Sequence, residues 1–229
     1  MRKSVFKSEA GRDVFRTYYN QILSQFPFRQ QFIETSFGKT FILAAGEEPN
    51  PPVILLHGSC SNSAFWFPEM MALSSSFRVY AIDIIGEAGN SEEYRPDIDS
   101  DDFAIWMKEV LDGLGLEKAV FIGNSLGGWM ALKFATAYPE RVSQLALIAS
   151  SGLAEVRRQF LDKIAQTLQS DDSVKVDSDL IGENSIPKEV LEFMNLIVES
   201  YNPIEYMPVY SDNKLKRLNM PVLFIDGEN

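Results

Sequence analysis

The chain has 229 residues, of which 45% are hydrophobic and 23% are charged. A chain of this length and composition can bury a full core, which excludes intrinsic disorder and favours one domain, or one domain with a lid. Asp and Glu outnumber Lys and Arg by 32 to 21, so the net charge is −11. This charge excludes nucleic acid as a partner, because phosphate binding needs a basic surface, and it disfavours an anionic membrane.

Cysteine usage and hydropathy together predict a cytoplasmic protein. Cys60 is the one cysteine of the sequence, which excludes an internal disulfide framework and a cysteine-rich metal site. No stretch reaches the roughly 18–20 apolar residues of a membrane span, and no signal-peptide core follows the basic N-terminus. The sequence does not determine the oligomeric state.

The N-terminal part predicts one helix and a hairpin. A helix is expected at about residues 8–25, with Ser8 as its cap and Val14, Tyr18 and Ile22 on one face. Two β-forming runs follow, joined by a short turn around a glycine, and they predict a hairpin at the start of a sheet. These runs cover residues 31–36 and 40–45.

The middle of the chain alternates between short apolar runs and helical patterns. The apolar runs are typical of strands that are buried on both faces. They cover residues 53–56, 78–82, 119–122, 145–149 and 222–225. The clearest helical patterns between them cover residues 100–114 and 126–138. This alternation predicts an α/β fold, with a mostly parallel twisted sheet and helices on both faces.

Residues 153–218 interrupt the alternation with two helical patterns and no strand between them. The first covers residues 154–169, and the second begins at Ser185 and carries apolar residues on one face. We expect this insert to form a helical cap or lid, with residues 1–152 and 219–229 as the core. An extra helical layer on the side of the core is the alternative.

The most informative motif is Gly123-Asn-Ser125-Leu-Gly127, between a predicted buried strand and a predicted helix. The G-x-S-x-G pattern alone occurs by chance in roughly one chain in ten, so its context carries the argument. In a tight strand–helix turn the hydroxyl of Ser125 projects outward, and a Cβ at Gly123 or Gly127 would collide with backbone. We therefore predict Ser125 as a nucleophile; the alternative is an inert serine in a glycine-rich turn.

A second signal is His57-Gly58-Ser59, at the end of an earlier buried strand. A reaction through Ser125 needs two backbone donors for the developing oxyanion. We predict that these are the N–H groups of Ser59 and Leu126, and that Gly58 lets its loop approach closely. Cys60, beside this loop, is interpreted as a small buried filler.

A third signal is a glycine-containing loop after the next strand, from Asp83 to Ser91. Together these segments resemble the α/β-hydrolase superfamily, in its usual order, from about residue 30 onward, and most resemble carboxylesterase-like members with a serine nucleophile. Glu87 departs from the resemblance, because the family often has His, Lys or Arg there. The segments that carry the resemblance are His57-Gly58, Asp83–Ser91, Gly123–Gly128 and Pro221–Glu228.

The resemblance implies a catalytic acid after the last of these segments and a catalytic histidine further on. The sequence has one histidine, His57, and the resemblance gives it a structural role in the oxyanion loop. We expect the base and the acid beyond residue 229, and the 229-residue chain alone to be nearly inactive. A natural relic without turnover is an alternative, and His57 as base or Asp226 or Glu228 as acid are weaker ones.

The sequence thus predicts a serine hydrolase that acts on small carboxylic esters or related acyl compounds, with no metal or organic cofactor. Aromatic and methionine side chains are candidates for an acyl pocket, although core packing is the commoner role. These candidates are Phe65, Trp66, Phe67, Met70, Met71 and Trp129. A non-catalytic small-molecule receptor or interaction protein on the same fold is the alternative.

Overall fold

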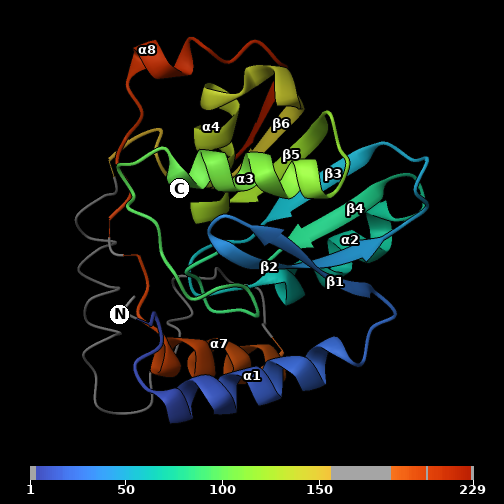
Figure 1. The fold of residues 1–229 in the computed structure, drawn as a ribbon, viewed down its shortest axis with the longest axis vertical. Coiled ribbons are helices and arrows are strands. Elements are labelled where there is room, and N and C mark those ends of the chain that lie inside the picture. Colours follow the sequence, from blue (N-terminus) through green and yellow to red (C-terminus); the bar gives the residue numbers. More distant parts are fainter. Residues whose placement is uncertain (1–3, 156–186, 205, 228–229) are drawn as a thin grey trace.

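The computed structural model describes residues 4–155, 187–204 and 206–227, and these residues form a sheet with helices packed on it (Figure 1). The strands are β1 (Arg29–Thr35), β2 (Gly38–Ala45), β3 (Pro52–Leu56), β4 (Arg78–Ile82), β5 (Ala119–Asn124), β6 (Val142–Ile148) and β7 (Val222–Ile225). The helices are α1 (Glu9–Leu23), α2 (Phe67–Leu73), α3 (Asp102–Gly113), α4 (Leu126–Ala137), α7 (Lys188–Ser200) and α8 (Asp212–Leu215), with 3-10 turns at Ser63–Trp66 and Pro139–Arg141.

The sheet has the order β1-β2-β4-β3-β5-β6-β7. The β1–β2 and β2–β4 pairs are antiparallel, and every pair from β4 to β7 is parallel. After β4 the chain crosses β3 to reach β5, so the strand order reverses there. The carboxyl ends of β3 and β5 lie side by side at this reversal, where open α/β sheets bind ligands.

Each face of the sheet has its own apolar core. On β3, Ile54 and Leu56 belong to a cluster that includes α3 and α4, whereas Val53 and Leu55 belong to one that includes α1, α2 and α7. This follows from the two-residue period of a strand, which turns successive side chains to opposite faces. The predicted α/β fold with helices on both faces is confirmed.

Helix α1 begins as predicted but buries a different face. The hydroxyl of Ser8 caps it by accepting from the N–H of Gly11 over 3.0 Å. The buried residues are Phe15, Tyr19 and Leu23, while Val14 is 59% exposed, so the predicted face was wrong by one position. Both stripes have the same four-residue spacing, and the aromatic one is buried because Phe15 and Tyr19 stack on α7.

Helix α7 lies against α1, as Figure 1 shows at one end of the molecule. The ring of Phe193 on α7 stacks on Phe15 at 6.0 Å and on Tyr19 at 5.9 Å between centroids. Most of the predicted helix at residues 154–169 and the whole linker after it lie outside the described residues. The division of the chain into core and lid stays a prediction.

Among the helices that the structure describes, none has the length and apolarity needed to cross a bilayer.

Candidate active site

Ser125 occupies the turn between β5 and α4 in a rare backbone conformation. Its φ of 50° and ψ of −111° lie outside the regions that non-glycine residues normally adopt. Neighbouring strands hold it there, because its N–H donates to the carbonyl of Ile148 over 2.9 Å and its carbonyl accepts from the N–H of Ser151 over 3.2 Å. A strained residue that its surroundings fix so firmly is a common feature of active sites.

The two glycines of the turn are required by close backbone contacts. A Cβ on Gly123 would overlap the carbonyl of Gly127, and a Cβ on Gly127 would overlap the carbonyl of Leu56. The first turn of α4 therefore packs directly on the end of β3. This packing brings the loop after β3 next to Ser125.

The loop after β3 lies against the Ser125 turn at Gly58. A Cβ added to Gly58 would lie 3.6 Å from the Cβ of Ser125 and 3.4 Å from Nδ2 of Asn124. The hydroxyl of Ser61 donates to the carbonyl of Gly58 over 2.8 Å and fixes the turn of this loop.

His57 uses both ring nitrogens to hold the same loop. Its Nε2 accepts from the N–H of Ile84 over 3.0 Å, so the ring proton is on Nδ1, which donates to the carbonyl of Gly58 over 2.8 Å. The ring is 1% exposed, and this burial lowers the pKa of His57. His57 is therefore neutral near pH 7, and neither nitrogen is available to take a proton from Ser125.

The N–H groups of Ser59 and Leu126 flank the Ser125 turn. Leu126 is the first residue of α4, so its N–H is among those that a helix leaves without an internal partner. Within the described part of the chain, neither N–H donates to a backbone or side-chain acceptor. Both are free to bind an oxygen of a ligand.

A cavity of about 580 Å³ opens over these segments. It brings together Ser125, His57, Gly58 and Ser59, whereas Leu126 is fully buried and does not line it. Its wall includes Cys60, Ser61, Phe65, Trp66, Glu69, Asn124, Ile148, Pro187, Val190 and Met194. Of the six acyl-pocket candidates, Phe65 and Trp66 line the cavity, whereas Phe67, Met70 and Trp129 are buried in the core and Met71 is exposed on α2. Most of the other wall residues were not singled out, because the sequence alone does not place α7 or the end of β6 beside Ser125.

The Asp83–Ser91 loop is anchored away from the cavity. The buried carboxylate of Asp83 accepts from the N–H and hydroxyl of Ser63 and from the hydroxyl of Tyr19, at 2.6–2.9 Å. The hydroxyl of Ser91 donates to the carbonyl of Asp83 over 2.6 Å and closes the loop. These contacts give the motif a structural role.

Residues 51–223 match the model of a protein family described as the alpha/beta hydrolase fold. The match covers most of the chain and includes both β3 and the Ser125 turn. The chain belongs to the α/β-hydrolase family.

Similar proteins indicate which kind of α/β hydrolase this chain is. The chain is 34% identical to carboxylesterase YbfK of Bacillus subtilis over 94% of its own length and 77% of the relative's. The crystal structure of carboxylesterase CesB (YbfK) superposes with a TM-score of 0.79, at 32% identity over 94% of this chain and 80% of the other. Naproxen esterase of the same organism gives a TM-score of 0.79, at 27% identity over 95% and 81%. The protein is therefore a carboxylesterase-like hydrolase, and the receptor alternative is not favoured.

Proposed function

We propose that the protein hydrolyses small carboxylic esters and related acyl compounds with Ser125 as the nucleophile. The observation that carries the proposal is the strained Ser125 turn, which lies in the wall of a cavity at the carboxyl ends of β3 and β5. The hydroxyl attacks the ester carbonyl, the alcohol leaves, and water then hydrolyses the acyl-enzyme. The carboxylesterase relatives support the same reaction class.

The N–H groups of Ser59 and Leu126 would hold the oxyanion that forms during attack. The Leu126 group is aided by the positive end of α4, and the Ser59 group is positioned by the His57–Ile84 hydrogen bond. One such donor commonly contributes about 2.7–4 kcal/mol to transition-state stabilisation. Gly58, Gly123 and Gly127 act indirectly, because they permit the close backbone contacts.

The proton acceptor in this proposal is a group other than His57. Both nitrogens of His57 are engaged by backbone groups, and its burial disfavours the protonated ring. Its role is to position the loop that carries Ser59.

The cavity wall suggests the kind of ester. Phe65, Trp66, Ile148, Val190 and Met194 offer apolar surface, and Glu69 is the one charged side chain in the described wall apart from neutral His57. An uncharged ester with an apolar acyl or alcohol group fits this wall better than an anionic one. The cysteine usage and hydropathy of the chain predict the cytoplasm as its compartment.

The test is ester turnover by the native protein. Ser125→Ala should lower kcat/KM for a short-chain aryl ester by roughly 10⁴-fold or more. Ser151→Ala, which removes a nearby hydroxyl while its backbone contact to Ser125 remains, is the matched control and should retain turnover. Unchanged turnover by Ser125→Ala would falsify the assignment.

A further inference from the structure

Glu87 is a buried carboxyl that the proposed reaction does not use. It is 1% exposed, and one of its oxygens, Oε1, lies 3.4 Å from the guanidinium of Arg95. The other oxygen, Oε2, is buried and has no hydrogen-bond partner among the residues that the structure describes. Burying an unsatisfied carboxyl oxygen is costly, so the position needs an explanation beyond packing.

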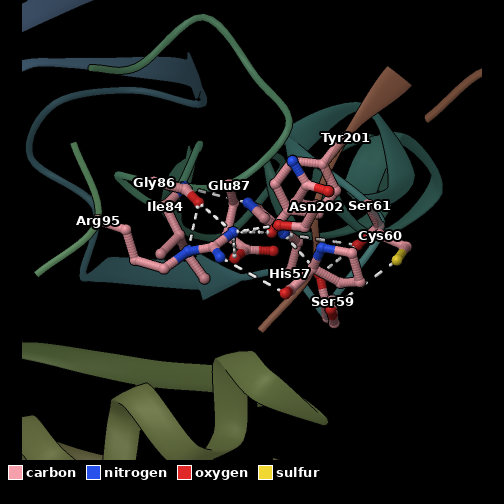
Figure 2. Close-up of polar contacts among 12 residues, drawn as sticks. His57, Ser59, Cys60, Ser61, Ile84, Gly86, Glu87, Arg95, Tyr201 and Asn202 are labelled. Atoms are coloured by element: carbon pink, nitrogen blue, oxygen red, sulfur yellow. Dashed lines mark hydrogen bonds and ion pairs between the residues drawn. The ribbon is translucent and has the colours of Figure 1, made fainter. Parts of the chain in front are cut away.

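Arg95 gathers acceptors from two separate parts of the chain around this carboxyl (Figure 2). On its own side it donates to the carbonyl of Gly86 through Nε over 3.0 Å and through a terminal nitrogen over 2.8 Å. The same terminal nitrogen, Nη2, also lies 2.6 Å from the hydroxyl of Tyr201 and 2.7 Å from the carbonyl of Asn202, so its two hydrogens are shared among three acceptors. The guanidinium thus ties the Glu87 loop to the segment that follows α7.

Tyr201 is where this cluster meets the helix that lines the cavity. It is fully buried at the C-terminal end of α7, and the same helix places Val190 and Met194 in the cavity wall. The chain before α1 holds this end too, since the N–H of Asn202 donates to the carbonyl of Val5 and the amine of Lys7 donates to that of Val198. A shift of this end of α7 would therefore move part of the cavity wall.

The Glu87 loop also holds the loop that carries Ser59. Ile84, three residues before Glu87, donates to Nε2 of His57, and His57 donates to Gly58. Cys60 follows Ser59 and has a positive φ of 54°. Burial and, to a smaller extent, the charge of Glu87 raise the pKa of its thiol to about 11. Figure 2 shows His57, Ser59 and Cys60 beside the Glu87–Arg95–Tyr201 cluster. One short loop thus contacts both the segment after α7 and the loop that carries Ser59.

We infer that Glu87 is a positioning residue. Through Arg95 and Tyr201 it holds the end of α7 in a fixed position relative to the Ser59 loop, and it releases this end when the carboxyl ionises. The inference rests on the proposed function where it treats the cavity as a substrate site. The coupling between the Ser59 loop and α7 is a property of the fold and does not depend on that function. The groups that face Glu87 are Arg95, Tyr201 and Cys60, with Lys7 near the thiol.

The direction of the pH effect follows from the surroundings of the carboxyl. Burial raises the pKa of Glu87 to about 7, and this outweighs the lowering by Arg95 and by the hydroxyl of Tyr201. When the cluster opens and the carboxyl is hydrated, its pKa returns toward the ordinary value of 4.5. The open form then loses its proton more readily, so opening becomes about thirtyfold more favourable between pH 5.5 and pH 8.5.

Hydrogen–deuterium exchange of the 229-residue chain tests the inference without any turnover. Protection factors of residues 188–200 and 57–61, corrected for intrinsic exchange, should fall together by about thirtyfold from pH 5.5 to pH 8.5. Glu87→Gln, which stays neutral, should abolish the fall in both segments. Asp112→Asn also neutralises a carboxylate that is paired with an arginine, Arg141, but at the surface of α3, and it should behave as wild type.

Tyr201→Phe is the second variant, in case Glu87→Gln does not fold. It keeps the ring and removes the hydroxyl, and it should lower the protection of residues 188–200 by about tenfold at pH 5.5. A wild-type profile without pH dependence, a fall that persists in Glu87→Gln, or full protection in Tyr201→Phe overturns the inference. Because exchange is read without substrate, failure of the coupling is distinguishable from failure of Ser125 as nucleophile, which only the ester assay reports.

Discussion

The carbonyl of Leu56, the last residue of β3, occupies the space that a Cβ on Gly127 would need. This contact sets the distance between the nucleophile turn and the loop that carries Ser59. It joins two segments that lie 71 positions apart in the sequence. One side of the contact is a backbone carbonyl, and the other is a glycine, which has no Cβ. The Ser125 turn therefore depends on glycine because of close packing.

Gly127→Ala should destabilise the protein by about 3 kcal/mol or more, because neither the end of β3 nor the first turn of α4 can move without breaking sheet or helix contacts. Gly58→Ala is the matched control in the facing loop, since its Cβ would make ordinary contacts of 3.4–3.6 Å, and it should cost less than about 1 kcal/mol. Urea denaturation of both variants measures the difference. Equal costs would show that the Leu56 contact is not limiting.

Tyr19 supports the Asp83 loop through a charge-assisted hydrogen bond in the core, where its hydroxyl lies 2.9 Å from Oδ1 of Asp83. Tyr19→Phe should cost about 1.5–3 kcal/mol, because a buried carboxylate loses a donor. Tyr210→Phe is the comparison, since its hydroxyl donates over 3.0 Å to the neutral carbonyl of Trp129, and it should cost about 1 kcal/mol. Thermal unfolding of the two variants should rank them in this order, and the reverse ranking would show that the Tyr19–Asp83 bond is not the stronger of the two.

Most of the sheet could be predicted from the sequence, because strands buried on both faces are continuous apolar runs such as residues 53–56 and 78–82. The Ser125 turn could be predicted because the motif, the strand and the helix all require the same geometry there. The short α2 helix was missed, since seven residues contain too few turns to show a period. The buried face of α1 was wrong because two stripes have equal spacing, and only packing on α7 decides between them.

The surroundings of the site could be predicted from the sequence only in part. Val190 and Met194 lie on a helical stripe that the sequence shows, but their place beside Ser125 depends on how α7 packs on α1 through Phe193. Glu87 stood out only as a departure from the family resemblance. Its partner Arg95 lies eight residues away in irregular structure, where no periodicity relates the two side chains.

The β7 strand of the 229-residue chain presents a run of exposed apolar side chains. Leu223 and Phe224 are each 58% exposed and Ile225 is 47% exposed, and among the described strands β7 pairs only with β6. Exposed apolar edges promote association between sheets. Phe224→Lys should therefore reduce self-association in light scattering, whereas Met71→Lys, at an isolated apolar residue that is 55% exposed on α2, should not. Equal effects of the two substitutions would point to net charge as the cause.

Glu87 should also give the global stability a distinctive pH dependence. Its pKa is about 7 in the folded protein against an ordinary 4.5, chiefly because of burial, so the folded state binds the proton more tightly than the unfolded state. Wild type should therefore lose stability as the pH rises from about 4.5 to 7, and this loss should level off above pH 7. Glu87→Gln has no such ionisation, so its free energy of unfolding relative to wild type should rise by roughly 3 kcal/mol over that range.

Urea titrations of wild type and Glu87→Gln at pH 4.5, 6 and 8 measure this difference directly. Asp112→Asn supplies the opposite sign, because hydrogen bonds from Lys108 and Arg141 lower the pKa of Asp112 and make its charged form the stabilising one. That variant should lose a little stability at neutral pH and none in strong acid, with solvent screening keeping the effect small. If the difference between Glu87→Gln and wild type is the same at all three pH values, the carboxyl does not ionise in the folded protein over this range.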